Sequence, residues 1–341
     1  METTMNVLMT GASGLIGSAL VAHFKSQGLQ VAPLVRHRPG PGTRQIFWDP
    51  AAGRLDASSI EGFDAVIHLA GLSNDPLGDY RSELTEEINE RGSTRLAQMA
   101  KEVGVKRFLF ASSCSTYGAS GADFLTEEAS FNPVTPYGRS KVDVETKLSG
   151  LADENFSPVY LRASTAYGMS PRIRFDLVAN NLTAWAFTTG RVHLKSDGTP
   201  WRPIVHVEDI CLAYIAALHA QREAVHNEAF NVGTTTENYQ MHEIAEIVEQ
   251  VVPNCRVDFA DDAGPDKRCY RVDCSKIART LHDFKPQWTA RRGIEQLYEG
   301  YRKVGLTLEE FEGQKYKRIA HVKYLIAEGL LDENLRWNGR H

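Results

Sequence analysis

A glycine-rich turn near the start of the chain constrains the fold more than any other part of the sequence. Gly11, Gly14 and Gly17 follow a short apolar run and open an amphipathic stretch that is predicted to be helical from Leu15 to about Gln27. In a strand–turn–helix unit the first glycine permits the tight turn, the second lets the backbone approach a pyrophosphate, and the third permits close packing of the helix on the strand. The helix N-terminus would also offer N–H donors to the phosphates. The turn therefore predicts dinucleotide binding.

Short apolar runs alternate with amphipathic helical stretches along the first half of the chain, which is the pattern of a parallel βαβ sheet. The runs predicted to be strands are residues 7–10, 31–35, 65–70, 108–113 and 158–162. Helices are expected after the glycine turn, near 83–103, 176–188, 207–221 and 240–252, and twice within 306–341. We therefore expect an α/β fold. Residues 1–165 would form a Rossmann-type, doubly wound parallel sheet, and residues 166–341 a smaller, interleaved substrate-binding lobe, with segments near 204–233 returning to the sheet.

The residues after the second predicted strand bear on the choice of dinucleotide. Proteins that bind NAD usually place an acidic residue there for the ribose 2′-hydroxyl, whereas an arginine suits the 2′-phosphate of NADP. This chain has Arg36 and Arg38 at that place and no acidic residue. The sequence therefore favours NADP, while NAD stays open if the two arginines are only solvated loop charges.

A tyrosine and a lysine stand four residues apart at a predicted helix start. Thr135 suits the N-cap, and Pro136 suits the first helical position, where its missing N–H costs nothing. The spacing stacks Tyr137 and Lys141 on one helix face. The lysine cation stabilises the phenolate and lowers the tyrosine pKa. The pair is therefore a candidate proton shuttle for alcohol/ketone redox chemistry.

Taken together, these motifs resemble the extended short-chain dehydrogenase/reductase family, in its nucleotide-sugar epimerase/dehydratase branch. The further segments similar to that branch are His68-Leu69-Ala70-Gly71, Asn89 with Gly92, Ser112 to Gly118, Ser196 to Arg202, His206 to Asp209 and Asn231-Val232-Gly233. They occur in the order that is typical of the family and extend over roughly residues 5–300. The resemblance implies an enzyme that acts on a nucleotide sugar with NAD or NADP as cofactor.

The resemblance also implies a role for each matched residue. Ser113 would bond the sugar oxygen that is oxidised or reduced, Tyr137 would move the proton, and Lys141 would also bond the nicotinamide ribose. The residues expected to contact the cofactor come from the glycine turn, from the ends of several predicted strands and from the Tyr137 helix. They are Gly11, Ser13, Gly14, Leu15, Ile16, Gly17, Arg36, Arg38, Leu69, Ala70, Gly71, Asn89, Ser112, Tyr137 and Lys141. The residues expected to contact the substrate are Ser113, Thr165, Asn181, Arg202 and Arg268. For Arg202, a structural salt bridge is an equal alternative to a phosphate contact.

Differences between this chain and other members of the branch limit the reactions that it is expected to catalyse. Its 4,6-dehydratases place an Asp-Glu pair after the catalytic threonine, and this chain has Cys114-Ser115 there, which supplies no suitable acid or base at neutral pH. Cys114 also stands one residue away from the cysteine of branch members that deprotonate a C–H bond, and such a shift turns a strand side chain to the opposite face. Water elimination and C–H deprotonation are therefore disfavoured.

Three hydride reactions remain. A 4-epimerase oxidises the C4 hydroxyl to a ketone and reduces it on the opposite face, an NADPH-dependent 4-ketoreductase runs the second half, and a dehydrogenase runs the first half. The sequence favours the epimerase, with the reductase or dehydrogenase as the alternative. A non-catalytic dinucleotide-binding regulator is less favoured, because such proteins commonly lose the tyrosine or the lysine. The nucleotide and the sugar stay open.

The composition of the chain argues against several other classes of protein. The formal net charge of −5 argues against a general nucleic-acid binder. The five cysteines form no CxxC pair and fit reduced thiols, and no metal-ligand spacing stands out. No apolar stretch is long enough to span a bilayer, and because a strand-like run begins by Asn6 we expect no signal peptide. We expect a cytoplasmic protein without a metal and, from the resemblance, a homodimer that pairs the helix near 83–103 with the Tyr137 helix.

Overall fold

The computed structural model describes residues 5–27, 30–35, 46–48, 55–73, 81–264 and 269–338. The first part of the chain alternates strands and helices. In chain order they are β1 (Asn6–Thr10), α1 (Leu15–Ser26), β2 (Gln30–Val35), β3 (Ile46–Phe47), β4 (Ala65–His68), α3 (Ser82–Thr85), the π-helical turn η2 (Glu86–Arg91), α4 (Gly92–Glu102), β5 (Arg107–Ser113), β6 (Ala119–Leu125), α5 (Pro136–Ser149) and β7 (Ser157–Ala163).

The second part is less regular and contains shorter strands. Its elements are β8 (Thr165–Tyr167), α6 (Val178–Thr189), β9 (Arg191–Ser196), β10 (Trp201–His206), α7 (Val207–His219), α8 (Arg222–Val225), β11 (Glu228–Val232), β12 (Asn238–Gln240), α9 (Met241–Val251), β13 (Arg256–Gly264), β14 (Cys269–Val272), α10 (Ser275–Thr280), α11 (Ala290–Val304), α12 (Leu308–Glu312) and α13 (Arg318–Ala327). Among these described elements, no helix is both long and apolar enough to cross a membrane.

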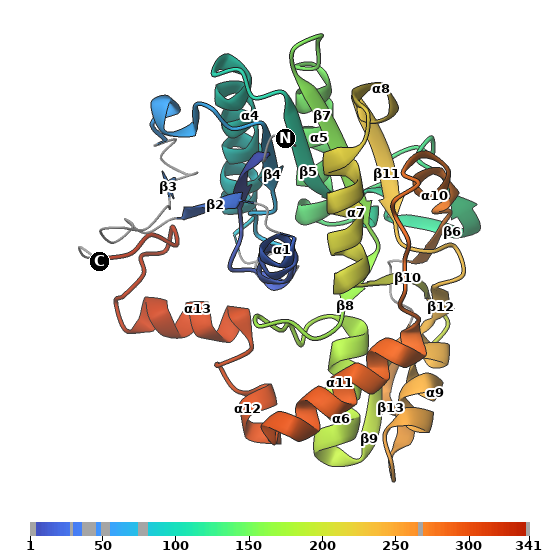
Figure 1. The fold of residues 1–341 in the computed structure, drawn as a ribbon. Coiled ribbons are helices and arrows are strands. Elements are labelled where there is room, and N and C mark those ends of the chain that lie inside the picture. Colours follow the sequence, from blue (N-terminus) through green and yellow to red (C-terminus); the bar gives the residue numbers. More distant parts are fainter. Residues whose placement is uncertain are drawn as a thin grey trace.

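A seven-stranded sheet with strand order β11-β7-β5-β4-β1-β2-β3 forms the centre of the molecule. All of its neighbouring strands pair in parallel. Helices α1 and α7 lie on one face of the sheet and α4 and α5 on the other (Figure 1). This arrangement confirms the predicted α/β fold with a Rossmann-type, doubly wound parallel sheet.

The strand order reverses between β1 and β4. From β1 the chain builds outward through β2 and β3 on one side, and from β4 through β5, β7 and β11 on the other. Loops that leave the carboxyl ends of two such strands diverge and open a crevice, which is where ligands bind in open α/β sheets. The fold therefore directs the search for a site to the loops after Thr10 and His68, the last residues of these two strands.

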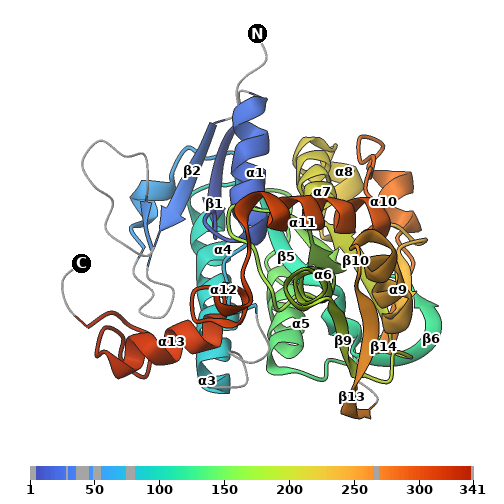
Figure 2. The same cartoon turned by 90° about the horizontal axis from the view of Figure 1, so that it is seen from below.

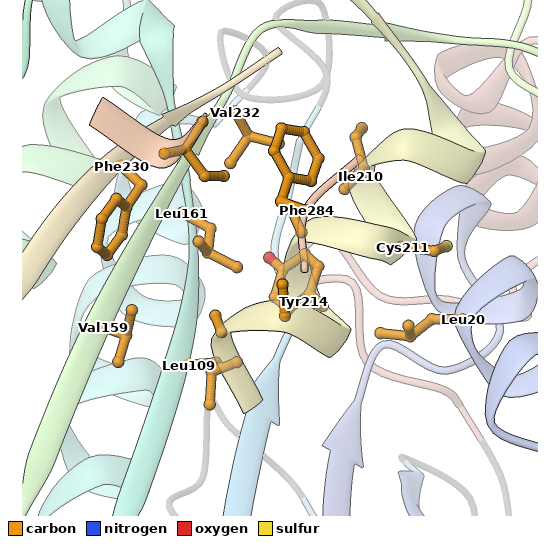
Figure 3. Close-up of a cluster of buried hydrophobic side chains, with 14 of the residues drawn as sticks. Leu20, Leu109, Val159, Leu161, Ile210, Cys211, Tyr214, Phe230, Val232 and Phe284 are labelled. Atoms are coloured by element: carbon orange, nitrogen blue, oxygen red, sulfur yellow. The ribbon is translucent and has the colours of Figure 1, made fainter. Parts of the chain in front are cut away.

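A continuous apolar core fixes helices α1 and α7 on the sheet. Leu109 of β5 and Leu161 of β7 lie against Ile210 and Tyr214 of α7, and Leu20 of α1 lies beside them (Figure 3). These side chains are 0 to 2 % exposed. Each contributes roughly 1.5–3 kcal/mol by leaving water, so the core holds the strand ends of the crevice in place.

The second part of the chain forms a lobe beside the sheet. Strands β8, β10 and β12 form a three-stranded sheet, while β9 pairs with β13 and β6 with β14. Helices α6, α9 and α11 pack on one another around a second apolar cluster. Strand β11 leaves this lobe and joins the edge of the large sheet beside β7. The assignment of cofactor binding to residues 1–165 and substrate binding to 166–341 stays a prediction.

The last two helices connect the lobe to the sheet. Helix α12 packs on α6, and α13 extends from there toward the side of the molecule that holds β2 and α3 (Figures 1 and 2). The chain beyond α13 reaches the start of α3, because the Arg81 Nη1 atom donates a hydrogen bond to the Glu333 carbonyl at 3.2 Å. The two helices predicted within 306–341 are therefore present, the first of them as a short one.

Candidate active site

The glycine turn lies at the carboxyl end of β1 and fits only glycine at two positions. Gly11 has φ of +69°, and a Cβ atom there would lie 2.8 Å from the Ala70 nitrogen. A Cβ atom on Gly17 would lie 2.1 Å from the Gly11 carbonyl oxygen. The Gly14 N–H donates to that same oxygen at 2.9 Å and caps the start of α1. The turn therefore forms a tight backbone cradle at the crevice, the glycine cradle, which fits a dinucleotide diphosphate.

A buried hydrogen-bond chain ties the ends of β1 and β4 together. Thr10 Oγ1 accepts hydrogen bonds from the Leu69 N–H at 3.1 Å and the Ala70 N–H at 3.0 Å. The Thr10 hydroxyl hydrogen is thus directed to His68 Nδ1, 2.7 Å away, and His68 Nε2 donates to Ser93 Oγ at 2.7 Å. Burial lowers the pKa of His68 to about 3, so the ring is neutral. The expected cofactor residues Leu69 and Ala70 are held in place by this chain.

Asn89 connects the loop after β4 to the helix that carries Tyr137. It lies in the π-helical turn Glu86–Arg91, a local widening that is frequent at functional sites. Its Oδ1 accepts from the Leu72 N–H at 2.7 Å, and its Nδ2 donates to the Leu72 carbonyl at 3.0 Å and to Ser140 Oγ at 3.2 Å. The Ser140 hydroxyl in turn donates to the Tyr137 carbonyl at 2.8 Å. Asn89 therefore orients protein groups around the crevice.

Helix α5 begins as the sequence predicts. Thr135 is its N-cap, with Oγ1 accepting from the Gly138 N–H at 3.1 Å, and Pro136 occupies the first turn. Lys141 is buried, and its Nζ donates to the Ala111 carbonyl at 2.6 Å and lies 5.4 Å from the centre of the Tyr137 ring. Burial lowers the pKa of Lys141 to about 8, against the opposing charge of Glu145.

Ser113 is the last residue of β5 and lies at the same corner of the crevice. Its half-buried side chain accepts a hydrogen bond from the Ser115 N–H at 3.1 Å. The hydroxyl hydrogen is therefore available to a ligand. Since Lys141 holds the carbonyl of Ala111, two residues before Ser113, the structure brings Ser113, Tyr137 and Lys141 together at the carboxyl end of β5.

Glu145 is a polar residue of this corner that the sequence reasoning missed. The Ser112 hydroxyl donates to its carboxylate, and Arg162 of β7 forms an ion pair with it at 2.7 Å. All three side chains are buried, and Arg162 is the direct strand neighbour of Ser112. Tyr137, Lys141 and Glu145 follow one another at intervals of four along α5. Glu145 and Lys141 thus anchor helix α5 to consecutive residues of β5.

Cys114 faces away from the crevice. Its side chain is fully buried, and Sγ donates to the Arg162 carbonyl at 3.1 Å. Burial raises the pKa of the Cys114 thiol to about 12. The thiol is therefore neither an acid nor a base at neutral pH, in agreement with what is expected of Cys114; the exclusion of elimination and of C–H deprotonation stays a prediction.

Three of the expected substrate residues lie in the lobe. Thr165 of β8 pairs beside Ile204 of β10, and Arg202 lies on the same strand β10, 6 % exposed, with Nη1 donating to the Trp201 carbonyl at 2.8 Å. Asn181 of α6 donates to the Phe175 carbonyl at 2.8 Å. Thr165 and Arg202 are thus on neighbouring strands, whereas the Asn181 amide supports a loop.

Arg36, Arg38 and Arg268 lie outside the described residues. Near the last of these, Arg271 of β14 stacks its guanidinium on the rings of Phe124, at 3.8 Å, and Trp201, at 4.3 Å. The part of the chain that the structure describes holds no group of three or more His, Cys, Asp or Glu side chains placed to bind a metal ion.

Known proteins share this fold and this sequence pattern. The family model described as "NAD dependent epimerase/dehydratase family" matches residues 7–233. The UDP-glucose 4-epimerase of Bacillus subtilis (strain 168) is 27 % identical over 337 residues, which cover 86 % of this chain and 94 % of that protein. The solved structure of MoeE5 in complex with UDP-glucose and NAD has a TM-score of 0.76 at 26 % identity and covers 88 % of this chain and 100 % of that one. UDP-glucuronic acid 4-epimerase from Bacillus cereus, in complex with UDP-glucuronic acid and NAD, shares the fold at a TM-score of 0.73 and 23 % identity, over 88 % of this chain and 100 % of that one.

Proposed function

Because this chain belongs to the NAD dependent epimerase/dehydratase family, we propose that it is a nucleotide-sugar 4-epimerase. The observation that carries the proposal is the corner at the end of β5. Ser113 ends that strand, Lys141 bonds the carbonyl of Ala111 on it, and the Lys141 ammonium lies beside the Tyr137 ring. The two residues that follow Ser113, Cys114 and Ser115, offer no acid–base pair for elimination. The UDP-glucose 4-epimerase relatives support a UDP-sugar as the substrate.

Each residue of the crevice has its own role in the proposed reaction. Bound in the glycine cradle, the dinucleotide supplies hydride transfer to and from the sugar. Tyr137 takes the proton of the C4 hydroxyl and later returns it, and the neighbouring Lys141 ammonium stabilises the phenolate. Ser113 donates its free hydroxyl hydrogen to the sugar oxygen. Asn89 and the Thr10–His68 chain hold the surrounding loops and so keep this geometry fixed.

The cofactor distinguishes the two leading reactions. An epimerase returns the hydride to the sugar and therefore recycles a tightly held NAD, whereas a ketoreductase consumes NADPH. The family is NAD dependent, while Arg36 and Arg38 favour the 2′-phosphate of NADP. We expect acid to release NAD in about stoichiometric amount from the purified protein. The same protein should interconvert UDP-glucose and UDP-galactose without added cofactor. An empty site that binds NADPH, with reduction of a 4-keto sugar and no interconversion, would show that the protein is the reductase.

The rate should depend on the charge of Lys141. The ammonium form stabilises the Tyr137 phenolate, and it is present below the lysine pKa of about 8 and lost above it. We therefore expect kcat to fall as the pH rises through about 8. The measurement is kcat at saturating substrate across roughly pH 6 to 10. The Lys141→Met variant should be slower and lack this fall. If kcat of Lys141→Met falls over the same alkaline range, the titration of a group other than Lys141 causes the fall.

Two expectations from the sequence remain proposals. The first is a homodimer that pairs helices α4 and α5 with those of a second copy; a monomeric mass in sedimentation at micromolar protein would rule it out. The second is a cytoplasmic location, which fractionation of the producing cells would test.

A further inference from the structure

Two arginines from distant parts of the chain converge on Ser73. Arg174, in the loop between β8 and α6, donates from Nη1 to Ser73 Oγ at 3.1 Å and from Nη2 to the Ser73 carbonyl at 2.9 Å. Arg318, the first residue of α13, donates from Nη1 to the same Ser73 Oγ at 3.4 Å. The two guanidinium groups therefore lie side by side, although 144 residues separate them in the sequence (318 − 174).

The charges of this pair are not balanced. Arg174 forms an ion pair with Asp176 at 2.5 Å. Within the described ranges, Arg318 forms no salt bridge with any carboxylate. Burial and repulsion by Arg174 and Arg172 lower the pKa of Arg318 to about 10, although the nearby carboxylate of Asp176 opposes the shift. Three arginines thus share the single carboxylate of Asp176. A half-buried cation beside a second one is costly unless an anion neutralises it. The arrangement is thus suited to an anionic ligand.

The arginine pair lies at the mouth of the crevice. Ser73 follows Gly71 and Leu72, the loop that leaves β4 and is held by Asn89. The loop that carries Arg174 also touches the start of α1, since Ser170 Oγ donates to the Leu15 carbonyl at 2.8 Å. The pair therefore stands between the glycine cradle and the lobe. Helix α13 adds the positive end of its dipole at Arg318.

We propose that Arg174 and Arg318 bind a diphosphate group and that helix α13 thereby closes the crevice over the bound ligand. A guanidinium group presents paired N–H donors that match the oxygens of a phosphate. The proposal rests on the proposed function, which supplies two diphosphates at this crevice, one in the dinucleotide and one in the nucleotide sugar. Helix α13 lies beyond residues 7–233, the part of the chain that the family model matches.

The test is the variant Arg318→Met in the full-length protein, which keeps the apolar stem and removes the charge. After bound nucleotide has been removed, calorimetric titration with NAD and, separately, with UDP measures the dissociation constants. We expect at least one of them to rise about tenfold or more. The unliganded variant should unfold at the same or a higher temperature than the wild type, because removal of Arg318 relieves its repulsion with Arg174. A purely structural arginine would give a lower unfolding temperature.

Matched variants complete the experiment. Arg318→Lys keeps the charge but not the fork and should bind with intermediate affinity, whereas Arg302→Ala removes an exposed arginine of α11 and should bind like the wild type. Weakening for NAD alone assigns the diphosphate of the dinucleotide, and weakening for UDP alone assigns that of the nucleotide sugar. Unchanged affinity for both ligands in Arg318→Met overturns the inference and leaves the proposed function intact. A wild-type protein that binds neither NAD nor UDP contradicts the proposed function itself, and the inference with it.

Discussion

Replacement of Tyr137 by phenylalanine is expected to lower kcat roughly a thousandfold, because it removes the group that carries the proton of the sugar hydroxyl. The substitution removes only the hydroxyl. The half-buried ring beside Lys141 and the cap of α5 stay in place, so the folded structure should be retained. The measurement is the initial rate of UDP-glucose and UDP-galactose interconversion at saturating substrate. The NAD content and the unfolding temperature are determined on the same sample.

Tyr324→Phe is the matched control, since Tyr324 lies on α13 and is 40 % exposed. This variant should have the wild-type rate. A Tyr137→Phe variant within tenfold of the wild type would show that another group moves the proton. Unchanged ligand binding in a protein with no measurable turnover in either form would favour the non-catalytic regulator instead.

Replacement of Glu145 by glutamine is expected to lower the free energy of unfolding by about 3–5 kcal/mol, because it leaves the buried Arg162 guanidinium without its counter-charge. It also removes the negative charge that opposes the lowered pKa of Lys141. Chemical denaturation measures the loss of stability. In the folded fraction, the alkaline fall of kcat should move to lower pH, since Lys141 loses its proton more readily.

The double variant Glu145→Gln, Arg162→Met distinguishes the effect of an unpaired buried charge from the effect of altered packing. Removal of both charges should restore most of the stability that the single variant loses, as is common when a buried ion pair is replaced as a whole. The alkaline fall of kcat should stay displaced, because Lys141 still lacks its neighbouring carboxylate. A double variant as unstable as Glu145→Gln, or a single variant that loses less than about 1 kcal/mol, would contradict this account.

The elements that the sequence predicts well carry local signals. The glycine turn and the apolar periodicity predict a helix from Leu15 to about Gln27, and the structure has it at Leu15–Ser26. The cap at Thr135 depends on one hydrogen bond within a single turn. Strand β5 is predicted within one residue, since its run of apolar residues is buried and continuous. In each case a few neighbouring residues decide the conformation.

The features that were missed depend on partners far away in the sequence. Helix α11 (Ala290–Val304) follows a loop that contains Pro286 and packs on α6 and α9. Strands β6 and β14 are stabilised by pairing with each other. The single helix expected near 83–103 is divided by the π-helical turn, which apolar periodicity does not reveal. Arg174 and Arg318 both bond Ser73, although 144 residues separate them in the sequence (318 − 174).

For Glu145, the sequence contained a signal that pointed to its role. It stands four residues after Lys141 and eight after Tyr137, on the helix face already assigned to the site. A carboxylate on a face that packs on a sheet needs a cationic partner. The partner, Arg162, is the last residue of the predicted strand 158–162, so the pair could have been proposed from the sequence. The pairing of β5 with β7, which places Arg162 beside Ser112, could not be predicted from the sequence.

The position of α7 on the sheet bears on how the protein is synthesised. Strands β1 to β7 lie within the first 163 residues, but the apolar face formed by Leu109, Val159 and Leu161 is covered by α7, which begins only at Val207. A nascent chain that ends between these points has made most of its sheet but leaves exposed the part of this face that α7 covers beside α1, a condition that favours aggregation and chaperone capture. The edge strand β11, residues 228–232, is translated later still. Productive folding is therefore tied to emergence of the second half of the chain from the ribosome.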